Sequence, residues 1–365
     1  MGLITGTTPK KDGYRMPAEF EPQERIWMLW PERPDNWRDR ALPAQEAYAA
    51  VARAIAEFEP VVIGVSSEYY EEAAERFSKD KRITVSPMPH DDAWIRDTGP
   101  TFLVNDKGNL RAADWKFNAY GGHYDGLYDP WDLDDALAGN ICSRIGIDRY
   151  RADFVLEGGS IHTDGQGTIL TTEMCLLSQG RNPSMSKEDI EDALKKYLGG
   201  EKVIWIPDGI DPDETNGHVD DVCCFTAPGE VACIYTDDTE DPSYEAAQKA
   251  FDMLSHATDA KGRKIKVHPI CMPKEPVRIG SGFYYEPSEG CIPRKAGDYC
   301  AASYINFLIV NGGIIVPQYG DENDARALNE LQALFPDRRA VGVPTREVVY
   351  GGGNIHCITQ QQPKV

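Results

Sequence analysis

Hydrophobic positions along the chain form two kinds of segment that alternate. Apolar residues at helical spacing predict helices near residues 44–58, 67–78, 131–144, 186–198, 242–255 and 321–335. Short apolar runs between them are typical of buried strands, at residues 61–65, 203–206, 230–235, 265–270, 313–317 and 341–343. Ser186 stands just before one of the helices as a typical cap. This alternation predicts an α/β fold.

The order of the elements is more specific, because it recurs five times. In each copy a helix is followed by a strand, a junction of small residues and usually a hairpin with a turn signal such as Asp-Gly-Gln-Gly. The copies begin with the helices near 67–78, 131–144, 186–198, 242–255 and 321–335. Five copies in 365 residues average 73 residues each, which favours a single domain, residues 1–365, built from one pseudo-symmetric repeat. A generic doubly wound sheet is the alternative.

One long stretch interrupts the fourth copy. Residues 276–300 are rich in glycine, proline and aromatic residues and show no periodic pattern. Loops of this length inside a compact domain usually serve a function. We therefore expect a lid over a site.

The charge balance narrows the class of partner. Acidic residues outnumber basic ones by 59 to 38, and the formal net charge is −21. Such a surface repels nucleic acid and anionic membranes and attracts small cations, so we expect neither nucleic-acid nor membrane partners. The chain has no apolar run of ~20 residues and no signal-peptide pattern, which predicts a cytoplasmic protein. Nine cysteines without a C-x-x-C pair argue against a disulfide framework or a zinc knuckle.

Reactive side chains fall at the same junction of successive copies. Asp97 precedes Gly-Pro, Glu157 precedes Gly-Gly, His218 and Asp220 follow a glycine, and Cys357 follows Gly-Gly-Gly-Asn-Ile-His. If the junctions of a closed repeat converge on its axis, three carboxylates, one imidazole and one thiol share a cavity. On a strand, positions 218 and 220 would point to the same face.

Crowded carboxylates predict a positively charged occupant, since they raise one another's pKa values unless a cation lies between them. A metal is one option, but the sequence lacks H-E-x-x-H and closely spaced Cys and His pairs. A planar guanidinium fits better, because its N–H groups match several carboxylates. Cys357 would then be the nucleophile and His218 the proton carrier.

Four neighbouring residues have weaker claims. Trp94 could stack on the substrate stem, although a core tryptophan is the commoner outcome. Arg96 is expected to pair with a carboxylate, and Asn354 has no assigned role. His356 should point away from Cys357 if that stretch is extended.

The chain resembles the agmatine deiminases of the bacterial and plant type, within the guanidino-group-modifying enzymes. The resemblance covers essentially the whole length, and no reactive position departs from the family pattern. The stretches that carry it are MPAEFEPQERIWMLWPERPDNWR (16–38), DDAWIRDTGP (91–100), VLEGGSIHTDGQGT (155–168), ETNGHVDDVCCF (214–225), PQYGDENDARA (317–327) and GGGNIHCITQQQP (351–363).

The resemblance implies a five-bladed pseudo-symmetric ββαβ propeller, the pentein fold. It implies hydrolysis of agmatine to N-carbamoylputrescine and ammonia, a step of putrescine biosynthesis and polyamine metabolism, with no metal or organic cofactor. Its implied roles are Cys357 as the nucleophile that becomes an amidino-cysteine and His218 as general acid and base. Glu157 would orient His218 and contact the guanidinium. Asp97 and Asp220 would clamp the guanidinium, and Glu214 would help to bind the substrate. We also expect a homo-oligomer.

Two alternatives stay open. An arginine deiminase or an amidinotransferase would use the same constellation, but a carboxylate-bearing substrate asks for a cationic residue, whereas agmatine favours an acid such as Glu214 or Asp213. The excess of negative charge leans toward agmatine. From another class, the chain could be a non-catalytic polyamine-binding module.

Overall fold

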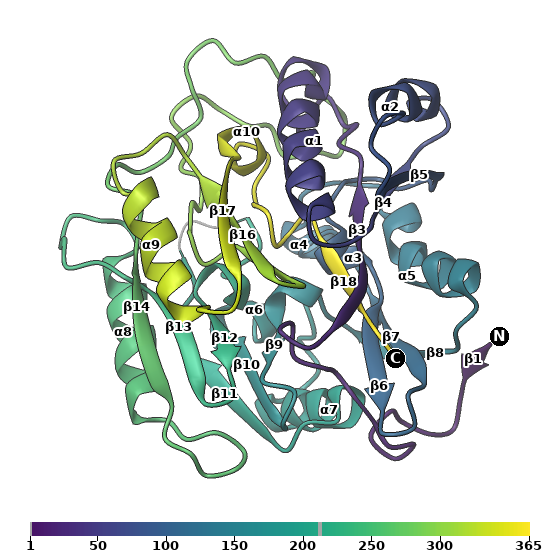
Figure 1. The fold of residues 1–365 in the computed structure, drawn as a ribbon, viewed down its shortest axis with the longest axis vertical. Coiled ribbons are helices and arrows are strands. Elements are labelled where there is room, and N and C mark those ends of the chain that lie inside the picture. Colours follow the sequence, from purple (N-terminus) through teal and green to yellow (C-terminus); the bar gives the residue numbers. More distant parts are fainter. Residues whose placement is uncertain (1, 211–213) are drawn as a thin grey trace.

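Five small β-sheets, each with a helix on its outer side, make up most of the computed structural model, which describes residues 2–210 and 214–365 (Figure 1). Each sheet contains an antiparallel pair of strands and a third, parallel strand that the chain reaches through a helix. Because a parallel step needs a crossover, the helix lies between the second and third strand of every unit. The prediction of a five-bladed ββαβ propeller is confirmed.

The units have the following bounds along the chain. The first unit combines the two ends of the chain. It consists of β18 (Gln360–Pro363), β3 (Gln23–Leu29), α1 (Leu42–Ala56) and β4 (Val61–Val65). The next two are β6 (Thr101–Asn105), β7 (Leu110–Lys116), α5 (Asp132–Ile145) and β8 (Arg149–Val155), then β9 (His162–Thr163), β10 (Thr168–Thr172), α7 (Lys187–Leu198) and β11 (Lys202–Ile206). The last two are β12 (Cys223–Ala227), β13 (Glu230–Tyr235), α8 (Tyr244–His256) and β14 (Lys266–Cys271), then β15 (Leu308–Val310), β16 (Gly313–Gln318), α9 (Asp324–Leu334) and β17 (Arg339–Pro344).

Short elements join these units. They are β1 (Leu3–Ile4), β2 (Tyr14–Arg15), α2 (Tyr70–Arg76), β5 (Ile83–Pro87), α3 (Ile95–Thr98), α4 (Gly122–Asp125), α6 (Glu173–Leu176) and α10 (Arg346–Val349), with short 3₁₀ turns at Asp39–Ala41, Gly158–Ser160 and Val219–Asp221.

The ring closes where the C-terminal strand β18 pairs antiparallel with β3 near the N-terminus (Figure 1). Gln360 lies opposite Trp27 in this ladder, and the Trp27 indole donates a 3.0 Å hydrogen bond to Gln362. The two ends of the chain therefore complete one sheet. This places the residues just before β18 beside those that follow β5.

The helix predictions are confirmed, but the first copy of the repeat was assigned to the wrong helix. The crossover helix of that sheet is α1, whereas α2 and β5 add a further parallel step at its edge. The error arose because the antiparallel partner of β3 lies at the far end of the chain. Ser186 does cap α7, accepting a 3.1 Å hydrogen bond from the amide of Asp189.

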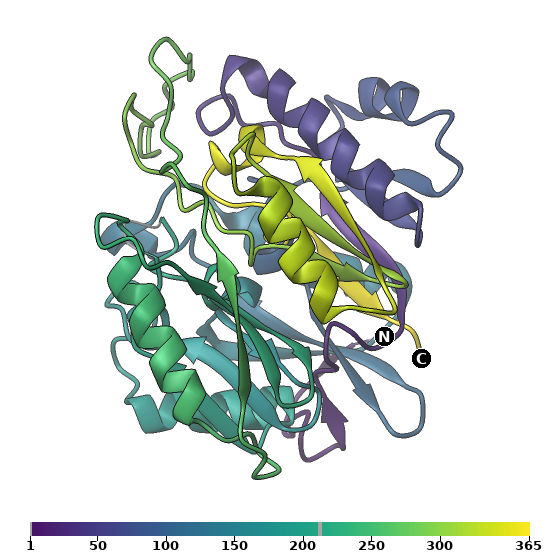
Figure 2. The ribbon, with the colours of Figure 1, turned by 60° about the vertical axis from the view of Figure 1, so that its left-hand side comes forward.

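Residues 276–300 lie in the long connection from β14 to β15 and project beyond the sheets (green, Figure 2). Their main-chain contacts include Glu286 to Pro34 at 2.9 Å and Ile292 to Leu127 at 3.0 Å. The stretch therefore lies against the segments that enclose the pocket described below. No helix in the described part of the chain has the length and apolar character needed to cross a bilayer.

Candidate active site

All five junctions between one unit and the next contribute to a single buried site. Asp97 comes from the segment between β5 and β6, Glu157 from that before β9, and His218 from that before β12. Asn306 precedes β15 and Cys357 precedes β18. The converging junctions thus bring together residues that are up to 260 positions apart.

Cys357 lines a pocket and is only 5% exposed. Its Sγ accepts a 3.1 Å hydrogen bond from the Asn306 side-chain amide and lies 3.8 Å from Asp220 Oδ2. Burial raises the pKa of the thiol well above its usual value, and Asp220, Asp221 and Asp97 add to the shift. The free site therefore holds a thiol rather than a thiolate.

The three glycines before this segment allow the pocket wall to pack closely. A Cβ at Gly351 would lie 2.2 Å from the Trp37 ring, and one at Gly352 would lie 2.2 Å from Glu214 Oε2. A Cβ at Gly353 would lie 2.8 Å from Trp94. The glycine-rich approach thus leaves room for the side chains of the wall.

His218 lies between two carboxylates. Its Nδ1 is 3.8 Å from Asp97 Oδ1, and its Nε2 is 3.8 Å from Glu157 Oε2. Burial opposes the charged imidazole, but Asp97, Cys175 and Glu157 together outweigh it and raise the pKa of His218 well above its usual value. A Cβ on Gly159 would lie 2.6 Å from His218 Nδ1 and 3.0 Å from Asp220 Oδ2, so these groups meet around a glycine.

The strand expected at positions 218 and 220 is wrong. Residues 219–221 form a 3₁₀ turn that His218 precedes. The turn nevertheless directs both side chains into the site, because His218 reaches Asp97 and Asp220 reaches Cys357.

Each carboxylate of the site has its own buried partner. Glu157 accepts a 2.7 Å hydrogen bond from Arg181, and both side chains are fully buried. Burial favours the protonated form of Glu157, but Arg181 and His218 together outweigh it and lower the pKa of Glu157. Asp97 accepts hydrogen bonds from Tyr120 at 2.9 Å and from the Gly159 amide at 2.8 Å, and burial raises its pKa to about 6. The negative charge of Asp97 is therefore stabilised less well than that of Glu157.

Replacing Arg181 by Met is expected to lower the free energy of unfolding by about 3–5 kcal/mol, because it leaves Glu157 charged and buried without its partner. Urea unfolding of the two proteins measures the difference. Lys195→Met is the matched control, since Lys195 makes a half-exposed pair with Glu191; that change should cost less than about 1 kcal/mol. Equal small losses in both variants would contradict the account.

Three residues with weaker claims have definite contacts. His356 Nδ1 lies 2.7 Å from Asp220 Oδ2, in a turn rather than in the extended conformation that would turn it away. Arg96 donates to the His356 carbonyl at 3.2 Å and to Gln361 Oε1 at 2.7 Å. The expected direct pairing of Arg96 with a carboxylate is therefore wrong. Asn354 donates to the Tyr319 hydroxyl at 3.1 Å.

Asp92 organises the pocket wall. It accepts hydrogen bonds from the indoles of Trp37 at 3.1 Å and Trp94 at 3.0 Å, and it pairs with Arg33 at 3.0 Å. The two indole rings lie 5.1 Å apart. Trp94 lines the pocket, so its ring is available to a substrate stem as well as to the core.

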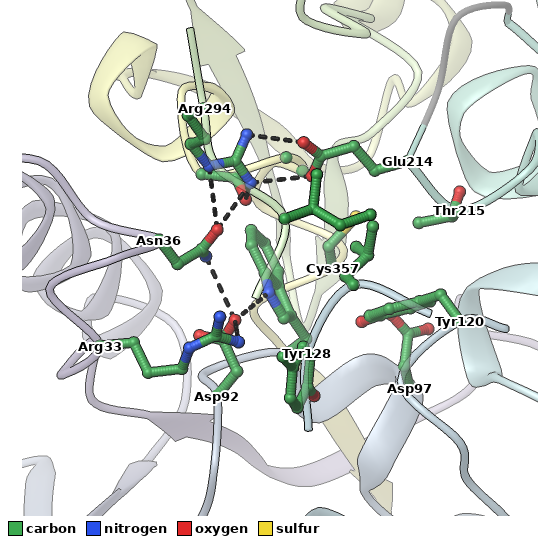
Figure 3. A pocket seen from close by; sticks show the side chains of 16 residues that line it. Arg33, Asn36, Asp92, Asp97, Tyr120, Tyr128, Glu214, Thr215, Arg294 and Cys357 are labelled. Atoms are coloured by element: carbon green, nitrogen blue, oxygen red, sulfur yellow. Dashed lines mark hydrogen bonds and ion pairs between the residues drawn. The ribbon is translucent and has the colours of Figure 1, made fainter. Parts of the chain in front are cut away.

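Glu214 also lines the pocket, but it is already paired. Arg294, from the 276–300 stretch, binds its two oxygens at 2.7 and 2.8 Å and also donates to Asn36 Oδ1 (Figure 3). Both pocket arginines, Arg33 and Arg294, are thus neutralised by acids. Asp213 lies outside the described residues.

Three buried groups of the described chain have His, Cys and carboxylate atoms close enough to hold a metal. Their candidate ligand atoms lie within 4.8 Å of one another, in the sets Glu19, His162 and His356; Glu157, Cys175 and His218; and Asp220, Asp221 and Cys357. In the first set His356 is hydrogen-bonded to Glu19, and in the second Glu157 is bound by Arg181. In the third set Cys357 lines the pocket, and the two carboxylates beside it suit an organic cation as well as a metal.

Three residues of the site were not predicted from the sequence: Asn306, Arg181 and Arg294. Asn306 lies after the insertion, which breaks the regular spacing of the junctions, and Arg181 follows α6 rather than a junction. The motif Ser-Tyr-Ile-Asn just before β15 was the available signal for Asn306, since that segment is the junction of its unit.

Known proteins share this chain's sequence and fold. A family model described as Porphyromonas-type peptidyl-arginine deiminase matches residues 15–363. A Lactococcus lactis protein, provisionally assigned as an agmatine deiminase, is 62% identical over 362 residues, which are 99% of this chain and 98% of that protein. The agmatine deiminase of Pseudomonas aeruginosa is 52% identical, covering 98% of this chain and 97% of that protein.

A solved structure of the agmatine deiminase of Enterococcus faecalis superposes with a TM-score of 0.98 at 60% identity, over the full length of both chains. These matches extend over nearly the whole chain and include every junction of the site. The chain therefore belongs to the Porphyromonas-type peptidyl-arginine deiminase family, among its agmatine deiminases.

Proposed function

We propose that this chain hydrolyses agmatine to N-carbamoylputrescine and ammonia through a covalent amidino-cysteine on Cys357. The observation that carries the proposal is a buried thiol that lines a pocket, with the carboxylates Asp97 and Asp220 near it. Carboxylates at this spacing bind a guanidinium and hold its carbon against the sulfur. A C. jejuni agmatine deiminase, 27% identical with a TM-score of 0.81, has been solved as a cysteine-to-serine variant with substrate bound.

The proposed reaction has two stages. The Cys357 thiolate adds to the guanidinium carbon, and His218 protonates one nitrogen, which leaves as ammonia. Water that His218 deprotonates then attacks the amidino carbon, and the carbon–sulfur bond breaks to give the ureido product and the free thiol. Glu157 orients His218 during both stages, while Asp97 and Asp220 hold the remaining nitrogens. All five units supply the site, so we propose that they act as one catalytic domain.

Substrate binding is part of the mechanism, because a cation beside Cys357 reverses the effect of the carboxylates on its pKa. The free thiol should therefore react slowly with neutral iodoacetamide, and the rate should keep rising with pH, since the raised pKa leaves little thiolate. A cationic haloacetamidine should react faster at Cys357, because Asp97 and Asp220 attract it. Cys291, the half-exposed cysteine, is the internal control.

Peptide mapping by mass spectrometry measures both reagents at both cysteines. The expected result is a cationic-to-neutral rate ratio at least about tenfold higher at Cys357 than at Cys291, the ratio that 1.4 kcal/mol of extra attraction gives. Equal ratios at the two cysteines would show that the carboxylates do not assist ionisation of Cys357.

Arginine is the second candidate substrate, because Arg33 and Arg294 line the pocket and could face a carboxylate. Both are already paired with acids, so a substrate carboxylate would have to displace Asp92 or Glu214. Comparing ammonia release from agmatine and from arginine at matched concentrations tests the choice. A higher kcat/KM for arginine than for agmatine would instead indicate an arginine deiminase.

A further inference from the structure

His356 and Glu19 form a second buried layer behind Asp220. His356 Nδ1 lies 2.7 Å from Asp220 Oδ2, and its Nε2 lies 2.8 Å from Glu19 Oε2. All three residues are at most 4% exposed. A carboxylate only accepts hydrogen bonds, so an imidazole placed between two carboxylates donates from both nitrogens and carries a positive charge.

The surrounding chain holds both Glu19 and His356 in place. Glu19 Oε1 accepts a 2.7 Å hydrogen bond from the Ile309 amide in β15. The His356 amide donates to Asn306 Oδ1 at 2.9 Å, and the Arg96 guanidinium donates to the His356 carbonyl at 3.2 Å. Asn306 also donates to Cys357 Sγ, so the nucleophile and the imidazole share an anchor.

The two oxygens of Asp220 are in different situations. Oδ2 is held by His356, whereas Oδ1 is buried and has no hydrogen-bond partner among the described residues. A buried carboxylate oxygen without a partner is costly unless a ligand supplies one. The anchored oxygen therefore fixes the rotation of the carboxylate, and the other remains for a guanidinium N–H.

We propose that His356 and Glu19 are positioning residues that keep Asp220 ionised and oriented toward the substrate guanidinium. This inference rests on the proposed function and deepens it. It also gives a role to the Met-Pro-Ala-Glu-Phe segment, since Glu19 supplies the second anion that keeps the imidazole charged.

The electrostatics agree with this arrangement. The charged and titratable groups around the His356 ring are Asp220, Glu19, Arg96, His162 and Cys357. Burial and Arg96 oppose the imidazolium, but Glu19 and Asp220 outweigh them and raise the pKa of His356. Burial favours protonated Asp220, but His356, His218 and Arg96 together outweigh this effect and lower the pKa of Asp220.

His356→Gln tests the role of the charged imidazole. Without the imidazolium the pKa of Asp220 should rise, so its ionised form is lost at a higher pH as the pH falls. The acid limb of the kcat/KM profile should therefore move to higher pH. The value of kcat/KM at its optimum should fall about 10- to 100-fold, the range for losing a hydrogen bond to a charged group.

Glu19→Gln tests the second anion without removing the imidazole. The pKa of His356 should fall toward its usual value, so the imidazole gives up its proton at lower pH and the alkaline limb of the profile moves to lower pH. Glu24→Gln is the matched control, because Glu24 follows shortly after Glu19, in β3, and is exposed to solvent beside Arg25. It should leave both limbs in place.

A purely structural role would lower thermal stability without moving either limb. Glu19→Gln preserves the shape of the side chain, so unshifted limbs in this variant would overturn the inference even if His356→Gln failed to fold. Ammonia release by the wild-type chain is measured first. An inert wild-type chain would overturn the proposed function and this inference with it, whereas an active wild-type chain with unshifted variants would overturn the inference alone.

Discussion

Cys357→Ser is expected to lower ammonia release from agmatine by at least about 10⁴-fold, a loss of the size seen when a catalytic nucleophile is removed. A serine hydroxyl ionises far less readily than a thiol, and Asp220 at 3.8 Å makes its ionisation harder still. The carboxylates would remain in place, so the variant should still bind agmatine. Calorimetry of binding, together with the ammonia assay, separates these two effects.

Cys291→Ser is the control for this change, because Cys291 is half-exposed and lies in the 276–300 stretch. It should retain nearly full activity. A folded Cys357→Ser variant with more than about one hundredth of wild-type activity would show that another group attacks the guanidinium.

His218→Asn is expected to lower kcat by about 10²- to 10⁴-fold, the usual contribution of a general acid and base. His218 lies 3.8 Å from both Asp97 and Glu157, and its raised pKa makes it an acid ready to protonate the departing nitrogen. The second stage also needs His218 to activate water. Any adduct that forms on Cys357 should therefore persist in the variant.

Mass spectrometry of the acid-quenched reaction measures the adduct at Cys357 over time. His256→Asn is the matched control, since His256 is exposed beside Asp252 and remote from the pocket lining. It should show wild-type turnover and no long-lived adduct. Equal decay of the adduct in His218→Asn and in the wild-type chain would assign the activation of water to another group.

The sequence predicted the fold well because its repeat is visible in local patterns. Helix periodicity and the small-residue junctions gave the five units, and those junctions then drew attention to Glu157, His218 and Cys357. Strand β3 was harder to recognise as a unit member, since its partner β18 is the last strand of the chain.

The supporting residues of the site were less accessible to sequence reasoning. Arg181 meets Glu157 from 24 positions away, and Glu19 meets His356 from 337 positions away. Such contacts depend on how the units close into a ring, which no local pattern encodes. The pairing of Glu214 with Arg294 likewise depends on where the insertion folds back, 80 positions later.

The most direct test of the central claim is a timed assay of the purified chain with agmatine, measuring ammonia and ureido product together, with arginine and Cys357→Ser in parallel. We expect equal amounts of both products from agmatine, a higher kcat/KM than for arginine, and no release by the variant. Absence of both products with the wild-type chain, or their release by Cys357→Ser, would contradict the proposed activity.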